Sequence, residues 1–258
     1  MKPALVLFLL VNLTMGAYGQ VKRHSKKGRR YKSESQFALK KHDFEVEWEF
    51  GREIIDSQLS TLVYPDMVLH YAFTDRFEVN TELNLVSFKN QSLESKTSGF
   101  EPVLIGANYQ VIKDSGYRPS VMISAQLALP FLASHQFAPD HLAPVVQLNI
   151  QEAIHDKWLF GAGGGLLWDG FSTAPNFIYN VSTSYSITKK WMFTAECFGF
   201  INHNLPQNSM DVSVAYVIND LVQFGITAGA GLSVAAPKHY FAVNGTWGLN
   251  TARKKTHP

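Results

Sequence analysis

Residues 44–50, FEVEWEF, alternate strictly between apolar and acidic side chains. A period of two places successive side chains on opposite faces of a β-strand, whereas an amphipathic helix needs a period near 3.6. The same alternation returns along the chain from residue 42 to residue 250, so the chain is predicted to be all-β. About twelve strands are expected, at 43–50, 66–73, 77–88, 101–111, 118–129, 142–153, 158–168, 176–187, 191–200, 209–218, 221–232 and 240–249.

The connections between these expected strands differ in length. Those after even-numbered strands are short, as at 74–76 and 188–190, whereas those after odd-numbered strands are usually longer, as at 51–64, 90–99 and 130–141. Bacterial outer-membrane barrels combine short periplasmic turns with longer external loops. The pattern therefore predicts an outer-membrane barrel, and an even number of strands places both termini in the periplasm.

The composition of the polar face indicates which way it points. In 147–151, QLNIQ, the polar positions are amides, and lysines fall in the expected turns rather than in the strands. A soluble barrel turns its apolar face inward and its exterior should be rich in lysine. We therefore predict a closed transmembrane antiparallel β-barrel with a polar interior. An aromatic girdle is expected at its periplasmic end, formed by Phe73, Phe77, Tyr185, Trp191 and Phe193.

The two ends of the chain differ from its body. Residues 1–19 have the layout of a cleavable signal peptide, with one early lysine, a short apolar run and small residues before Gln20. This run is shorter than the roughly 20 apolar residues that a spanning helix needs. Domain boundaries are then predicted as a signal peptide at 1–19, a basic flexible arm at 20–41, the barrel at 42–250 and a basic tail at 251–258. The lone Cys197 excludes an intramolecular disulfide.

Charge is divided unequally between these parts. Residues 21–41 contain nine lysines and arginines against one acid, whereas residues 42–250 contain twenty acids against ten lysines and arginines. For an exported protein, a basic arm predicts a solvated segment, or contact with anionic lipid head groups or cell-wall polymer, rather than nucleic-acid binding.

Several stretches of the second half carry a family resemblance. Residues 119–130, 164–170, 194–200, 219–224 and 228–231 resemble the family described as "Putative MetA-pathway of phenol degradation", whose members are often called outer-membrane transporters. The resemblance covers roughly residues 117–249. It implies a barrel in the outer membrane of a Gram-negative bacterium that passes small solutes, aromatic or apolar molecules among them.

Strand parity selects a set of candidate lining residues for the barrel interior. Rings or walls of carboxylates attract cations and exclude anions, so an acidic interior favours cations or polar neutral solutes. The alternative is a narrow barrel that is filled by hydrogen-bonded side chains. The predicted lumen-lining residues are Glu45, Glu47, Glu49, Glu78, Asn80, Glu82, Glu196 and Asp211.

These observations predict a passive channel or transporter whose partners are outer-membrane lipids and a small-molecule solute. A structural barrel that binds partners through its loops is the main alternative. A lipid hydrolase is less favoured, because no G-x-S-x-G element occurs and only His70 lies clearly within a strand. No enzymatic activity, metal or cofactor is expected. The glycines at 161–165 lie within a strand, where close packing of neighbouring side chains explains them.

Overall fold

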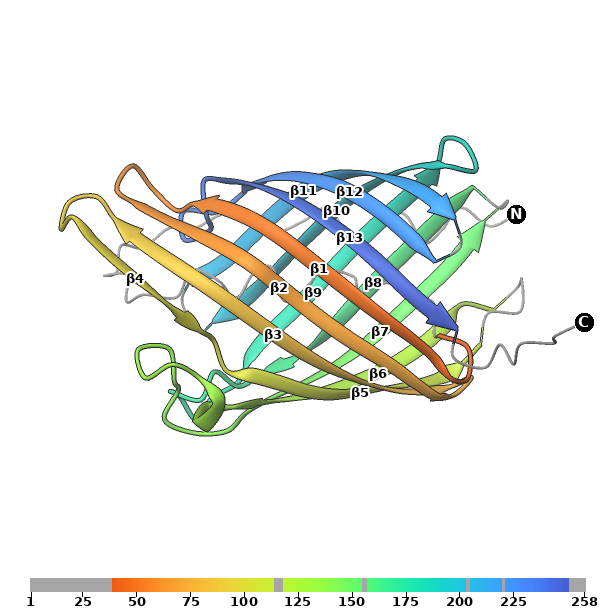
Figure 1. The fold of residues 1–258 in the computed structure, drawn as a ribbon, viewed down its shortest axis with the longest axis horizontal. Coiled ribbons are helices and arrows are strands. Elements are labelled where there is room, and N and C mark those ends of the chain that lie inside the picture. Colours follow the sequence, from red (N-terminus) through yellow and green to blue (C-terminus); the bar gives the residue numbers. More distant parts are fainter. Residues whose placement is uncertain (1–38, 114–117, 155–156, 203–204, 220, 251–258) are drawn as a thin grey trace, which may run out of the picture.

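The computed structural model describes residues 39–113, 118–154, 157–202, 205–219 and 221–250 (Figure 1). The predicted signal peptide, the C-terminal tail and all but the last three residues of the basic arm lie outside them. Within these residues, thirteen strands form one antiparallel sheet, which closes where β2 pairs with β3. The strands are β1 Asp43–Ile54, β2 Leu59–Thr74, β3 Phe77–Asn90, β4 Ser95–Phe100, β5 Val103–Ile112, β6 Ser120–Leu129, β7 Ala143–Ile154, β8 Trp158–Leu167, β9 Asn176–Ser186, β10 Trp191–Asn202, β11 Leu205–Asn219, β12 Val222–Gly231 and β13 His239–Asn250.

Strands β4 and β5 together occupy one position in the barrel. Residues 85–90 of β3 pair with β4, and residues 77–82 of the same strand pair with β5. The closed sheet therefore has twelve strand positions, which confirms the predicted barrel. Closure leaves every strand except β4 paired on both sides, and such pairing is what a lipid environment requires.

The burial pattern shows that the apolar face points outward. On β7, Leu148 and Ile150 are 45% and 42% exposed although they are apolar, whereas Gln151 is only 7% exposed. A soluble barrel would show the reverse. Exposed Leu62 and Phe73 are eleven residues apart on β2. At about 3.4 Å per residue and a tilt near 40°, this separation spans roughly 29 Å, close to the ~25 Å apolar band of outer-membrane barrels.

Among the described residues, no helix has both the length and the apolar character needed to cross a membrane. Within the described residues, the helical structure is a single 3-10 turn, η2 Pro130–Leu132, in the connection between β6 and β7.

The predicted aromatic girdle is present at the end of the barrel that carries the short turns. Phe73, Phe77, Trp191 and Phe193 are all exposed on the outer face. Rings also pair across neighbouring strands there: the Trp158 and Tyr185 centroids are 4.6 Å apart, and those of Trp191 and Tyr216 are 4.8 Å apart. Such cross-strand aromatic pairs stabilise a sheet, and amphipathic rings suit a membrane–water interface.

Two of the predicted loops prove to be extended hairpins. Residues 51–64 were expected to be a loop, but β1 continues to Ile54 and β2 already begins at Leu59. The expectation was wrong: alternation is not sustained through this stretch, yet its residues still pair, and Pro65 lies at a break in register between Val63 and Asp66, where no ladder hydrogen bond is needed. The tight turn is held by Asp56 Oδ1, which accepts the backbone N–H groups of Gln58 and Leu59.

The predicted loop at 90–99 is likewise the hairpin of β3 and β4. Its turn contains Glu94, whose φ of 47° lies in the left-handed region. The two hairpins are joined by a hydrogen bond from Gln91 N to Gln58 O, and both project beyond the barrel in Figure 1. The free edge of β4 is covered by the β6–β7 connection, since Gln136 Nε2 donates to Ser98 O.

Candidate functional site

The inner face of the barrel carries all eight predicted lining residues. Five of them are buried against the wall, and the three glutamates of β1 are half-buried. Among the described residues, His70 is the one basic side chain on this buried face, because the lysines and arginines of the barrel lie in turns, hairpins or a loop. The buried lining residues are Glu78, Asn80, Glu82, Glu196 and Asp211.

Glu78 forms the centre of a polar cluster that links three strands. His70 Nδ1 on β2 lies 3.3 Å from Glu78 Oε1 on β3, and Asn108 Nδ2 on β5 donates to the same oxygen at 2.7 Å. Burying a carboxylate costs free energy unless partners such as these hydrogen-bond to it. The cluster therefore keeps Glu78 against the wall.

Two pairs of carboxylates stand directly opposite each other on neighbouring strands. Glu49 pairs with Asp66 across β1 and β2, and Glu196 pairs with Asp211 across β10 and β11. Like charges in direct cross-strand register repel each other. The structure therefore brings Glu196 and Asp211 together, which spacing along the sequence could not reveal.

Interior glycines let polar side chains reach across a whole strand. Tyr240 Oη donates to Asp211 Oδ2 at 2.6 Å by passing over Gly229, where an added Cβ would lie 2.3 Å from the tyrosine ring. In the same way, Gln126 Nε2 reaches Asn80 Oδ1 over Gly106.

Gly163 has the same role on β8. It lies between Asn149 and Asn180, and a Cβ at this position would meet the Oδ1 atoms of both asparagines. Close packing of neighbouring side chains is therefore confirmed as the reason for this glycine. Glycines give these bridges room by lacking a side chain, and the bridges hold polar groups along the wall.

Tyr240→Phe is expected to lower the free energy of unfolding by about 1.5–3 kcal/mol, because it removes a hydrogen bond to a buried carboxylate. Urea unfolding of the refolded protein in vesicles measures this change. Tyr179→Phe is the matched control, since Tyr179 Oη donates to Asn208 outside the acidic interior. Equal, small effects in both variants would contradict the assigned importance of the Tyr240–Asp211 bond.

An apolar layer lies on the inner face at the end of the barrel opposite the first described residues. Val145, Leu167, Ile178 and Phe200 form one buried cluster there, and none of these side chains is more than 6% exposed. Phe198 extends this layer toward Tyr240, with ring centroids 6.4 Å apart. Sequence analysis did not single out this layer. The parity that turns Glu196 inward also turns residues 198 and 200 inward, so the signal was available.

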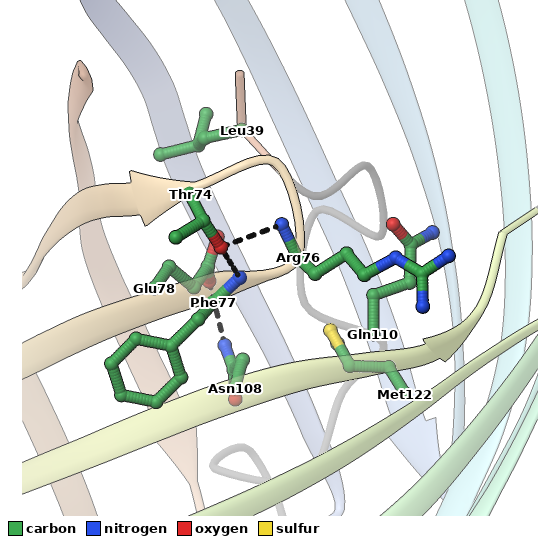
Figure 2. Close-up of a pocket in the computed structure, with 8 residues that line it drawn as sticks. All are labelled: Leu39, Thr74, Arg76, Phe77, Glu78, Asn108, Gln110 and Met122. Atoms are coloured by element: carbon green, nitrogen blue, oxygen red, sulfur yellow. Dashed lines mark hydrogen bonds between the residues drawn. The ribbon is translucent and has the colours of Figure 1, made fainter. Parts of the chain in front are cut away.

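At the other end of the barrel, the start of the described chain lies beside the β2–β3 turn. Leu39 lines a small pocket there together with Thr74, Glu78 and Asn108, and Figure 2 shows it above the β2–β3 turn, next to Thr74. The Leu39 backbone hydrogen-bonds to Glu78. Lys41 N donates to Asp75 Oδ1 at 2.9 Å in the β2–β3 turn, which fixes the chain as it enters β1.

Asp75 predicts a pH-dependent attachment of this segment. The hydrogen bond from the Lys41 backbone is the main cause that lowers the pKa of Asp75 below its usual 3.8, and the charges of Lys113, Lys41 and Lys40 act in the same direction. The ionised Asp75 carboxylate therefore stabilises the contact above pH 3.8, and this stabilisation is lost as pH falls through the lowered pKa. Protection of the Lys41 amide, measured as its exchange rate relative to the intrinsic rate at the same pH, should therefore be high at pH 6 and fall in strong acid. Asp75→Asn should abolish this pH dependence of the protection; an unchanged fall in protection in that variant would contradict the assignment.

The hydrolase alternative requires a nucleophile and base that can reach lipid. His70 is only 5% exposed and contacts Glu78 on the inner face, so its ring does not face the membrane. Among the described residues, no group of three or more histidine, cysteine or acidic side chains is arranged to hold a metal ion.

The sequence and the fold both match known proteins. Residues 27–248 match the family described as "Putative MetA-pathway of phenol degradation". The chain belongs to this family. The match begins inside the predicted basic arm and spans the barrel nearly to its end, well beyond the stretches in which the resemblance was first seen. No curated protein sequence is significantly similar.

Solved structures show which barrels this member of the phenol-degradation family resembles. An outer membrane channel from Pseudomonas putida F1 superposes with a TM-score of 0.68 at 13% identity, over 84% of this chain and 99% of the other. The KdgM porin in complex with disordered oligogalacturonate gives a TM-score of 0.58 at 9% identity, over 79% and 98% of the two chains. The NanC porin gives 0.54 at 8% identity, over 78% and 98%. The chain thus has the β-barrel fold of outer-membrane channels and porins.

Proposed function

We propose that this barrel is a passive channel for small solutes, that it prefers cationic and neutral molecules over anions, and that aromatic or apolar molecules are among its solutes. The observation that carries the proposal is the charge of the inner face, where carboxylates face the interior without lysine or arginine among the described residues. A wall of one charge sign raises the local concentration of counter-ions and repels ions of its own sign.

The three half-buried glutamates of β1 are the proposed path for cations along this wall. Glu45, Glu47 and Glu49 follow one another on one face of the strand, and span about 14 Å at ~3.4 Å per residue. Their partial exposure distinguishes them from Glu78 and Glu82, which neighbouring side chains cover. A solute in the interior would therefore meet these three charges first.

The apolar layer at the loop end supports the proposal that apolar or aromatic molecules are passed. A layer of Leu, Ile and Phe side chains disfavours water and hydrated ions, but offers contact to an apolar solute. This support is consistent with the family description, which refers to phenol degradation. An apolar solute would contact Ile178 and Phe198 only if neighbouring side chains moved, since both are almost fully buried.

We also propose that both termini face the periplasm. The short β2–β3, β9–β10 and β11–β12 connections lie at the same end as the start of β1 and the end of β13, and short turns are periplasmic in barrels of this type. The basic arm would then meet anionic head groups on the periplasmic side. Protease added outside intact cells should leave an epitope at the C-terminus uncut. Cleavage there would show that the C-terminus faces the outside and would contradict the proposed orientation.

The test of channel function is conductance of the refolded mature protein in a planar bilayer. A concentration gradient of phenyltrimethylammonium benzenesulfonate across the bilayer distinguishes passage of an aromatic cation from passage of an aromatic anion of similar size. A steady current with a cation-selective reversal potential is expected. Failure of a folded, heat-modifiable barrel to pass either ion or any neutral solute in vesicle-swelling assays would contradict the proposal and favour a structural or loop-binding barrel.

A further inference from the structure

The lysines and arginines of the barrel are distributed very unevenly. Of the ten between residues 42 and 250, six lie in the short connections at the terminal end and one in the β12–β13 loop. The remaining three, Arg52, Lys89 and Lys96, lie together on the two hairpins that project at the other end. We refer to these three residues as the hairpin cations.

The strand register places the hairpin cations on the outer face. Arg52 pairs with Leu62, and Lys89 pairs with both Ser60 and Lys96. Residues in direct antiparallel register share one face of a sheet. Leu62 is 44% exposed, whereas Glu53 on the other face is 2% exposed. The hairpin cations therefore point away from the lumen.

Between these residues is an open hollow of about 640 Å³. Its lining includes all three hairpin cations, the hydroxyl side chains of Ser60 and Ser87, and a single acid, Glu94. The direct register of Lys89 with Lys96 is destabilising by itself, because like charges then stand opposite each other. An anion with more than one negative group would relieve this repulsion.

The hollow continues the outer apolar surface of the barrel. Leu62 lines it, and exposed Phe50 precedes Arg52 by two residues on the same face of β1. A soluble anion would gain nothing from exposed leucine and phenylalanine beside its binding site. A lipid, in contrast, combines a charged headgroup with chains that would lie along this apolar surface.

We propose that the hairpin cations bind the phosphate groups of an anionic membrane lipid, whose acyl chains pack on the adjacent apolar belt. The headgroup occupies the hollow, and its negative charges separate Lys89 from Lys96. The lipid then anchors the projecting hairpins at the membrane surface. This binding site lies outside the barrel and does not depend on whether the lumen conducts.

Native mass spectrometry of the refolded full mature protein tests this binding site. The protein is released from phosphatidylcholine nanodiscs that contain a minor fraction of diphosphorylated lipid A, and the retained lipid is counted. The unchanged protein is expected to retain lipid A. The variant R52Q/K89Q/K96Q should bind it about 100-fold more weakly, since each basic residue near a membrane surface contributes about fivefold.

The control K113Q/K157Q/K189Q removes the same charge from exposed positions at the opposite end and should retain lipid A. K89R/K96R, which keeps the charge, should also retain it, and all variants must show the heat-modifiable mobility of a folded barrel. Equal loss in the triple variant and the control would overturn the site. Complete displacement of lipid A by excess inorganic phosphate would overturn the lipid assignment, because the site would then bind phosphate without need of the chains.

Discussion

Leu148→Arg is expected to destabilise the barrel by about 2–4 kcal/mol, the cost of an arginine at the middle of a lipid-facing strand. Leu148 lies near the centre of β7, is 45% exposed, and is paired with Ile123 on β6 and Gly164 on β8. The new guanidinium would be surrounded by hydrocarbon, with no water to solvate it. Reversible urea unfolding in vesicles gives the change in free energy.

Ile154→Arg provides the control for depth. Ile154 is exposed on the same face of the same strand, but it is the last residue of β7, beside the short turn. Near the interface the same substitution costs only about 0–1 kcal/mol, because the arginine reaches water. Equal destabilisation by the two substitutions would contradict the placement of the apolar belt.

The triple substitution E45Q/E47Q/E49Q is expected to lower the preference for cations over anions about tenfold, since it removes three charges from the wall while keeping side-chain volume and polarity. The preference is read as the reversal potential across a gradient of phenyltrimethylammonium benzenesulfonate. Glutamine can keep many of the hydrogen bonds of the wall, so the barrel should still fold. High ionic strength should reduce the difference between the two proteins, because salt screens exposed charges.

The matched control is E94Q/D140N/E152Q, which removes three charges from exposed positions outside the β1 wall. It should leave the reversal potential close to that of the unchanged protein. Cation preference that survives loss of the β1 glutamates but falls in the control would place the selective charges at the rim and not along the lumen.

Much of the fold could be predicted because alternation is a local property. The run at 147–151 shows which residues share a face, and its amides identify the inner one. The hairpins at 51–64 and 90–99 could not be predicted in this way. Alternation of apolar and polar residues is not sustained along either stretch, so the contrast between faces disappears, and Pro65 resembles a strand end until its bulge is seen.

Within the candidate site, the alternation along each strand predicted which residues face inward but not which of them meet. It selected Glu196 and Asp211 as inward-facing residues, but the two became a carboxylate pair only through the register of β10 against β11. Register depends on pairing between strands that the sequence specifies only collectively. The Tyr240–Asp211 bridge over Gly229 needs three strands in register at once, so no single stretch of sequence contains it.

By itself, the sequence determined that the chain is a twelve-position barrel with lipid-facing apolar residues and an acidic inner face, because these features follow from the identity of alternate residues along each strand. The tertiary structure alone decided how inner residues meet: which carboxylates face each other, which tyrosine crosses which glycine, and that Phe198 and Phe200 join an apolar layer. It also gathered Arg52, Lys89 and Lys96 into one outward-facing hollow. The physical reason is that side chains distant in sequence become neighbours only when sheet closure and strand register fix their positions in space.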